Sequence, residues 1–289
     1  MSQYSLYQPF YRDHIPKPSA VPDSSPLYIA SILNAIGARP SAGLLRRLPA
    51  EAWDPLSTAA IAVGLAPLLH CRLESLAVTP PPAARARLSL GYQAHAHRNQ
   101  AIARQLTELL AAFSAAGIPV IVLKGALLAH LVYPDPALRP MNDIDLLFRP
   151  ADLPTAARVL EDLGYQGHHK SAGEGAGVVK HLSTYRRPGP QAQTPNPFLS
   201  TAGDRMVEPH GSLEESWFGL RVDITPGVWE RAVPLVLHDQ PAYRLSDEDT
   251  LLHLAVHAVF HVIMGRLVFL QLYDIGQVLH TWGHRLNWT

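Results

Sequence analysis

Residues 118–147 read IPVIVLKGALLAHLVYPDPALRPMNDIDLL, which predicts a strand, a short helix and a second strand in close succession. Residues 119–123 form an apolar run rich in β-branched side chains, which is typical of a buried strand. After Gly125 the chain has no helix breaker until Pro134, so a short helix is expected there. Because free N–H groups at a helix start attract anions, this glycine turn is a candidate phosphate site.

The second strand of this stretch carries two carboxylates, Asp143 and Asp145. Strand side chains alternate between faces, so both carboxylates point to one face while Ile144 and Leu146 point to the other. Two carboxylates roughly 7 Å apart repel each other unless a cation lies between them. Mg²⁺ prefers hard oxygen ligands and keeps substrate phosphates in its shell, so it fits such a pair. A strand end that is merely acidic and solvated is the alternative interpretation.

These residues resemble the DNA polymerase beta-type nucleotidyltransferase superfamily, and within it a bacterial family labelled as uncharacterised nucleotidyltransferases. The segments that carry the resemblance are LKGA at 123–126 and RPMNDIDLL at 139–147, and the similarity runs from about residue 98 to residue 274. The resemblance implies an α+β fold, in which a mixed β-sheet is flanked by helices and helical regions precede and follow it.

The resemblance also implies roles for individual residues. It places the metal ligands at Asp143 and Asp145. It assigns nucleotide and phosphate binding to four positions: Lys124, Gly125, Ala126 and Arg139. A lysine at a strand end can instead extend its ammonium to solvent or pair with a nearby carboxylate, so both interpretations of Lys124 stay open.

A third carboxylate is expected in the segment RMVEPHGSL, at 205–213. The resemblance places it at Glu208, as a catalytic residue and metal ligand, and places the family's histidine at His210. Strand alternation puts both side chains on one face. Pro209 lacks an N–H, which fits the edge or end of a strand better than a strand paired on both sides. Asp223 is the rival position for the third carboxylate.

A helix is expected at 250–264, with Ser246 as its N-cap. It carries His253, His257 and His261 at i, i+4 and i+8, close to one face. Zinc is one interpretation, but three rings spread over two turns do not converge on one ion unless the helix bends. We therefore expect these histidines beside the site, with His257 and His261 as candidates for contact with substrate or with the carboxylates.

The pattern of breakers and periodic segments predicts four parts. These are a flexible arm at 1–25, a helical N-terminal region at 26–116, a nucleotidyltransferase core at 117–245 and a helical C-terminal region at 246–289. The N-terminal region ends in one long helix at about 83–116, which follows the stop TPPP at 79–82 and precedes Gly117.

Composition limits the class of protein. The 24 basic and 24 acidic residues give a net charge of zero, so neither nucleic acid nor an anionic membrane surface is an expected partner. Cys71 is the only cysteine, which is typical of a reducing compartment. The N-terminus lacks an apolar signal core and no run approaches the ~18 apolar residues of a membrane span. A cytoplasmic location is expected.

The sequence therefore predicts a nucleotidyltransferase that depends on Mg²⁺, with Mn²⁺ as the alternative ion, and moves NMP from an NTP to a hydroxyl group. ATP is the foremost candidate donor, and a small molecule, peptide or protein is the candidate acceptor. Glu208 or His210 would accept the proton of the attacking hydroxyl. The alternative is a catalytically degenerate relative that binds a nucleotide or a partner protein. The position of Glu208 relative to Asp143 and Asp145 discriminates between these functions.

Overall fold

The computed structural model describes residues 25–168, 184–189, 205–217 and 219–288. Within these residues the main sheet has seven strands in the order β3-β4-β5-β2-β1-β9-β8, and β6 and β7 form a separate pair. β2 is parallel to β5 and β1 is parallel to β9, while the other neighbours are antiparallel. The strand bounds are β1 Ile121–Val122, β2 Asp143–Leu147, β3 Gln166–His168, β4 Thr184–Arg187, β5 Arg205–His210, β6 Glu214–Trp217, β7 Leu220–Asp223, β8 Val233–Leu237 and β9 Gln240–Arg244.

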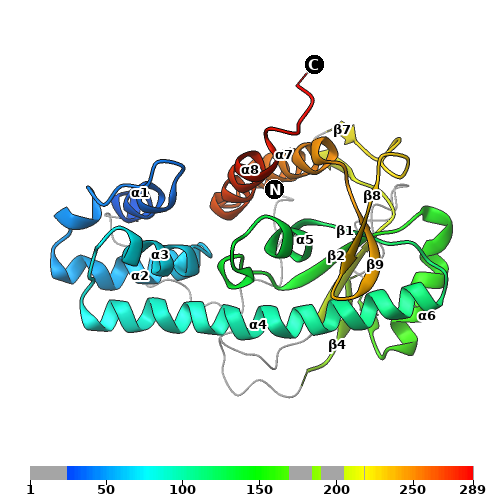
Figure 1. Ribbon diagram of the computed structural model, residues 1–289, viewed down its shortest axis with the longest axis horizontal. Helices are drawn as coiled ribbons and strands as arrows, with labels where there is room; N and C mark the ends of the chain where they lie inside the picture. The colour runs from blue at the N-terminus through cyan, green and yellow to red at the C-terminus, as the bar shows by residue number, and fades with distance from the viewer. Residues whose placement is uncertain (1–24, 169–183, 190–204, 218, 289) are drawn as a thin grey trace, which may run out of the picture.

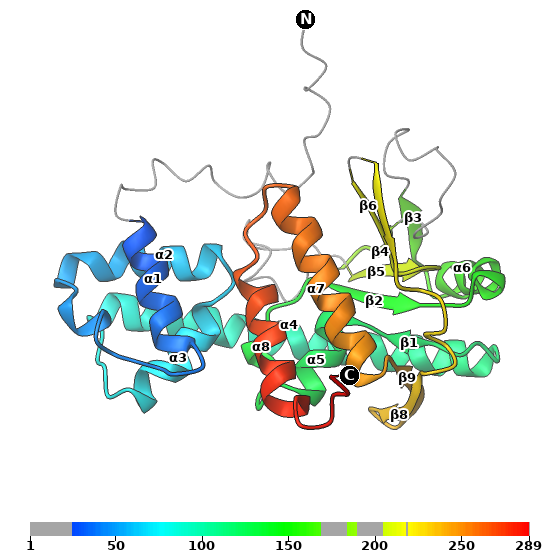
Figure 2. The same cartoon turned by 90° about the horizontal axis from the view of Figure 1, so that it is seen from above.

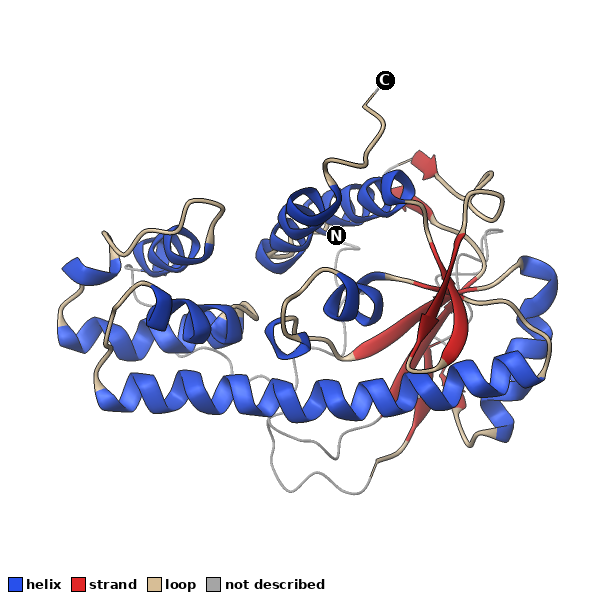
Figure 3. Cartoon of the chain, in the orientation of Figure 1, coloured by secondary structure: helices blue, strands red, loops and turns tan. Residues whose placement is uncertain are grey.

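Helices surround the mixed sheet and extend beyond it at one end (Figure 1). Their bounds are α1 Ser25–Ile36, α2 Trp53–Ala62, α3 Ala66–Ser75, α4 Pro82–Ala115, α5 Lys124–Leu131, α6 Leu153–Asp162, α7 Asp247–Ile263 and α8 Phe269–Trp282. Figure 3 shows that the strands gather at one end of the molecule, while α1 to α3 form a helical group at the other end. The predicted α+β architecture with a mixed sheet is confirmed.

The long helix α4 connects the two ends of the molecule, as Figure 1 shows. Leu88, in its first half, packs in the core of the helical group. Leu106 and Phe113, in its second half, pack in the core beneath the sheet. Its 34 residues agree closely with the predicted helix, and Gly117 follows it with a φ of +69°. The helix therefore holds the sheet and the helical group in one body.

Two local features mark where helices begin and end. Within the helical N-terminal region, α2 ends at Ala62 and α3 begins at Ala66. Gly64 lies between them with a φ of +73°, a conformation that glycine adopts without the steric penalty of a Cβ atom. Asp152 occupies the N-cap position of α6, although its side chain makes no cap hydrogen bond.

The C-terminal helices α7 and α8 lie across the side of the sheet opposite α4 (Figures 1 and 2). The predicted N-cap is confirmed, because Ser246 Oγ accepts a hydrogen bond of 3.0 Å from the N–H of Asp249. Among the described helices, none combines the length and the hydropathy that crossing a bilayer requires. All but the last residue of the predicted arm at 1–25 lies outside the described residues, and so do 169–183 and 190–204 within the predicted core.

Candidate active site

The parallel pairing of β2 and β5 assembles the candidate site. Its register places Asp145 opposite Glu208 and Leu147 opposite His210, and side chains at directly paired positions project from the same face of a sheet. One ligand atom from each of Asp145, Glu208 and His210 lies within 4.8 Å of the others. The structure thus places Glu208 beside Asp145. Asp143 lies two residues before Asp145 on β2, so its side chain projects from the same face.

Pro209 fits this arrangement because of where the neighbouring pairing ends. β4 pairs with β5 only along Arg205, Met206 and Val207, so the described pairing on that side stops before the proline. The missing N–H is therefore tolerated, as expected for a strand end. Next to this position, Thr184 Oγ1 donates a 3.1 Å hydrogen bond to Glu208 Oε1, a contact that the sequence did not predict.

Asp145 lies at the centre of the charged network. Its Oδ1 atom accepts hydrogen bonds from Lys124 Nζ and from His210 Nε2, each at 2.8 Å. Burial favours the neutral carboxyl, but the neighbouring Lys124 and His210 outweigh burial and hold the pKa of Asp145 well below its usual range. Asp145 is therefore ionised and available as a ligand at any pH near neutrality.

Asp143 has the opposite electrostatic environment. Burial, followed by the charges of Asp145 and Glu208, raises its pKa to about 7, and Lys124 and Arg139 offset this only in part. Close carboxylates of like charge hold a proton between them unless a cation is bound. The donor set of carboxylate oxygens with one imidazole nitrogen fits Mg²⁺ or Mn²⁺ chemically.

Lys124, the first residue of α5, reaches Asp145 from just beyond the end of β1. The Leu123 N–H donates to the Asp145 carbonyl oxygen at 3.0 Å, which fixes the chain just before the lysine. Lys124 itself has a φ of +45°, a conformation that is strained for a residue with a long side chain. Its side chain is only 13% exposed, so it pairs with a carboxylate and does not extend to solvent.

The turn at Gly125 differs from the prediction. α5 begins at Lys124, so Gly125 and Ala126 lie in its first turn and not before the helix. Their N–H groups belong to the helix start, where the dipole favours an anion. The structure gives another reason for the glycine, because an ideal Cβ at this position would lie 2.7 Å from Arg139 Nη1 and 3.3 Å from Met141 Cβ.

Comparison with known proteins identifies the fold and its class of chemistry. The profile of a family described as "Uncharacterised nucleotidyltransferase" matches residues 49–289. The chain belongs to this family. The predicted family and the prediction of an enzyme, a nucleotidyltransferase, are therefore confirmed.

Two solved structures of the antibiotic-resistance factor ANT(2″)-Ia are similar to this nucleotidyltransferase at 12% sequence identity. The solution structure aligns with 65% of this chain and 87% of its own, with a TM-score of 0.44. The crystal structure with adenylyl-2″-tobramycin aligns with 63% of this chain and 90% of its own, with a TM-score of 0.42. The search of curated proteins found no matching sequence.

Arg139 of the nucleotidyltransferase is engaged with the C-terminal helix α8. Its Nε and Nη2 atoms donate to Asp274 Oδ1 at 3.2 Å and to Asp274 Oδ2 at 2.7 Å. Tyr133 Oη donates to the same Oδ1 atom at 2.6 Å. Asp274 is only 1% exposed, so this is a buried bidentate pair. Phosphate binding by Arg139 stays a prediction, and it would require the guanidinium to leave or share Asp274.

Two polar residues of α4 that the sequence did not single out hold the segment before β2. Arg98 Nε donates to the Met141 carbonyl at 2.9 Å, and Asn99 Nδ2 donates to the carbonyl oxygens of Pro136 and Arg139 at 2.5 and 2.9 Å. Both side chains are buried. Their place on the buried face of a predicted helix is a signal that could have identified them.

The three histidines of α7 have different surroundings: His253 is buried, whereas His257 and His261 contact each other. His253 is buried, and burial followed by nearby Lys124 holds its pKa well below the usual value, so it is neutral. His257 Nε2 lies 2.9 Å from His261 Nε2, and His257 Nδ1 lies 3.4 Å from Glu215 Oε1 on β6.

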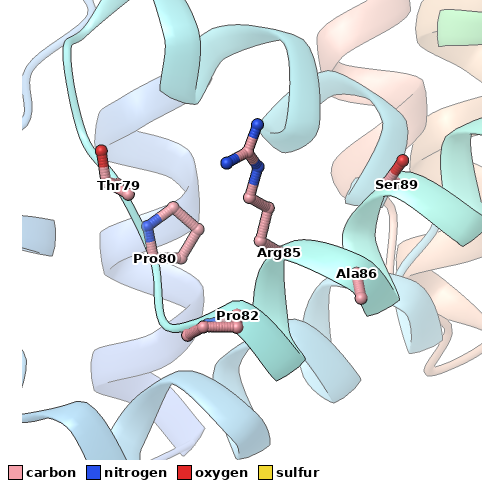
Figure 4. Close-up of a pocket in the computed structure, with 6 residues that line it drawn as sticks. All are labelled: Thr79, Pro80, Pro82, Arg85, Ala86 and Ser89. Atoms are coloured by element: carbon pink, nitrogen blue, oxygen red, sulfur yellow. The ribbon is translucent and has the colours of Figure 1, made fainter.

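Other polar features lie apart from the carboxylate cluster. Asp223, the rival third carboxylate, is exposed on β7 and accepts a 3.0 Å hydrogen bond from the Thr225 N–H. A cavity at the start of α4 belongs to the helical group (Figure 4) and has one cationic side chain and no carboxylate in its lining. It is lined by Thr79, Pro80, Pro82, Arg85, Ala86 and Ser89.

Proposed function

We propose that this nucleotidyltransferase transfers NMP from an NTP to an acceptor hydroxyl group, with Mg²⁺ or Mn²⁺ held by Asp143, Asp145 and Glu208. The observation that carries the proposal is the β2–β5 register, which sets Glu208 directly beside Asp145. Three carboxylates on one sheet face supply the hard oxygen ligands that these ions prefer. When bound, such an ion stabilises the negative charge that develops on the transferred phosphoryl group.

Lys124 and the first turn of α5 are the groups proposed to bind the triphosphate. The Lys124 ammonium lies beside the carboxylates, and the N–H groups of Gly125 and Ala126 lie at a helix start. A point charge together with backbone donors suits the β- and γ-phosphates. Arg139 is a second candidate cation, although its donors are directed at Asp274 in this structure.

Glu208 is the proposed general base, which accepts the proton of the attacking hydroxyl. The acceptor oxygen forms a bond to the α-phosphorus, the bond to the pyrophosphate oxygen breaks, and the hydroxyl proton moves to the Glu208 carboxylate. His210 is the weaker candidate, because its Nε2 atom is already bonded to Asp145 Oδ1. Thr184 donates to Glu208 Oε1 and would orient that carboxylate for the transfer.

The remaining parts of the proposal concern partners and compartment. ATP is the proposed donor, and the acceptor is a hydroxyl of a small molecule, peptide or protein. With no net charge, the chain lacks the basic excess that a nucleic-acid acceptor would favour. The single cysteine fits the cytoplasm.

Calorimetric titration of each NTP with and without Mg²⁺ tests the proposal. We expect Mg²⁺-dependent binding of at least one NTP to the wild type and loss of that binding in the Asp143→Asn/Asp145→Asn double variant. Binding that needs no metal and survives the double variant would contradict the metal assignment.

A matched pair of single variants tests the third carboxylate. Glu208→Gln removes an acidic group from the cluster, whereas Asp223→Asn removes one from an exposed strand of the separate β6–β7 pair. We expect pyrophosphate release to fall at least about 100-fold in Glu208→Gln and to stay unchanged in Asp223→Asn. A different result would be that the wild type binds NTP but releases no pyrophosphate with any small-molecule, peptide or protein acceptor. That result would favour the alternative of a catalytically degenerate nucleotide-binding protein.

A further inference from the structure

Two histidines of α7 bring their imidazole nitrogens close together. We propose that His257 and His261 bind a divalent transition-metal ion of the Zn²⁺ or Ni²⁺ class, at a site distinct from the carboxylate cluster. The residues lie one helical turn apart, so both rings leave the same face of α7. Their Nε2 atoms are 2.9 Å apart.

This spacing suits two nitrogen ligands of one ion. Zinc–imidazole bonds are about 2.0–2.1 Å long, so two nitrogens 2.9 Å apart subtend an angle of roughly 90° at a shared ion. The two rings are steeply inclined, with an interplanar angle of 80°, so they do not stack against each other. The closest alternative is a simple hydrogen bond between the imidazoles, which the experiment below distinguishes.

Glu215 provides the feature that favours a metal. Its Oε1 atom lies 3.4 Å from His257 Nδ1, and it comes from β6, not from α7. Metal-bound histidines usually donate their second ring N–H to a carboxylate or carbonyl, which fixes the tautomer and strengthens the ligand. With the Nδ1 proton directed at Glu215, the His257 Nε2 lone pair is directed at the other ring. Glu215 is only 5% exposed, so this carboxylate is held in place.

A second histidine pair in the same molecule provides an internal comparison. His130 Nε2, at the end of α5, lies 3.4 Å from His238 Nε2, on the turn between β8 and β9. Within the described residues, no carboxylate lies within hydrogen-bond distance of either ring. Burial followed by His238 lowers the pKa of His130 to about 4. The proposed site therefore differs from this pair in having an orienting carboxylate.

The two sites should select different ions. The set formed by Asp145, Glu208 and His210 is dominated by oxygen ligands, which suit Mg²⁺ and Mn²⁺, whereas an imidazole pair suits Zn²⁺, Ni²⁺ or Cu²⁺. Two protein ligands leave further coordination positions to water or to a bound anion. Because Glu215 lies on β6 and the histidines on α7, a bound ion would also stiffen the contact between these two elements.

Calorimetric titration of tag-free protein with Ni²⁺ tests the inference. The titration is run in the Glu208→Gln background, which removes a ligand from the carboxylate cluster, and thermal unfolding confirms that each variant is folded. We expect about one Ni²⁺ per chain, lost in His257→Phe and in His261→Phe, and retained in the control His130→Phe/His238→Phe. Glu215→Gln should weaken binding by about 10- to 100-fold.

Three results would overturn the inference. They are no Ni²⁺ binding in the Glu208→Gln background, undiminished binding in His261→Phe, and loss of binding in the His130→Phe/His238→Phe control. Because His261 is partly exposed, its replacement should leave the fold intact, so undiminished binding in that variant has a clear meaning. These results are separate from the proposed nucleotidyl transfer, which depends on the carboxylates of β2 and β5.

Discussion

Lys124 Nζ lies 2.8 Å from Asp145 Oδ1, the same oxygen that accepts the hydrogen bond from His210 Nε2. Lys124 is also one of the few non-glycine residues in the described chain with a positive φ. The ammonium therefore lies against a carboxylate assigned to metal binding. A divalent cation at Asp145 and the ammonium repel each other, because both are positive and close.

Lys124→Met should therefore strengthen the binding of Mn²⁺. The variant keeps the length of the side chain but removes the competing charge, so we expect the Kd for Mn²⁺ to fall by about tenfold or more. Titration followed by electron paramagnetic resonance of free Mn²⁺ measures this. Lys124→Arg keeps the charge, and Arg87→Met removes a cation from an exposed pair in the helical group; neither should tighten binding. Unchanged or weaker binding in Lys124→Met would show that the lysine does not compete with the ion.

Asp143 should make the free energy of unfolding depend on pH when EDTA keeps the site free of metal. Its folded-state pKa, about 7, is raised above the usual carboxyl value of 3.8, so the native state binds this proton more tightly than the unfolded state does. The stabilisation from this carboxyl is complete below about pH 4 and is lost as pH rises through about 7. Urea denaturation from about pH 5 to about pH 8 should show the free energy of unfolding of the wild type falling relative to that of Asp143→Asn, a difference that cancels the opposing contributions of histidines with a lowered pKa, such as His130 and His253.

The same carboxyl predicts how Mn²⁺ binding depends on pH. Because the ion binds the ionised form, its affinity should rise with pH until about pH 7 and then level off. In Asp143→Asn the affinity should be lower and this rise should be absent. An affinity for Mn²⁺ in the wild type that does not change across this range would contradict the raised pKa.

Asp274→Asn should destabilise the protein because it leaves the Arg139 guanidinium without its buried counter-ion. Removing one partner of a buried ion pair costs about 3–5 kcal/mol, and the two side chains here are 13% and 1% exposed. Tyr133→Phe removes only a hydrogen bond to Asp274 and should cost about 1 kcal/mol. Guanidinium denaturation measures both changes. Equal effects of the two variants would show that the ion pair contributes little.

Gly125→Ala should also be destabilising, by about 1–3 kcal/mol. Its new Cβ atom would meet Arg139 Nη1 at 2.7 Å and Met141 Cβ at 3.3 Å, and Arg139 cannot yield freely because Asp274 holds it. Gly276→Ala on α8 is the matched control, since its Cβ atom would meet nothing within 4 Å and alanine favours helices. In thermal unfolding, the midpoint temperature of Gly276→Ala should equal or exceed that of the wild type. Similar midpoints for both variants would contradict the packing explanation.

The local sequence predicted the faces of the two charged strands. Alternation in residues 143–147 and 205–210 determines which side chains share a face, and that period is a property of any strand. Likewise, the breakers around the long helix set its bounds, and the Ser246 cap depends only on residues three apart. These predictions agree with the structure because each rests on a short-range pattern.

Tertiary structure decided which of these groups meet. Asp145 and Glu208 lie 63 positions apart in the sequence (208 minus 145), and only the parallel pairing of β2 with β5 sets them side by side. The partners of Lys124 and Arg139 come from β2 and from α8, so no local pattern could assign them. Glycine at 125 suggested a phosphate turn, whereas in the structure it also makes room for Arg139. Local periodicity determined where each carboxylate points, and long-range packing determined which charge it faces.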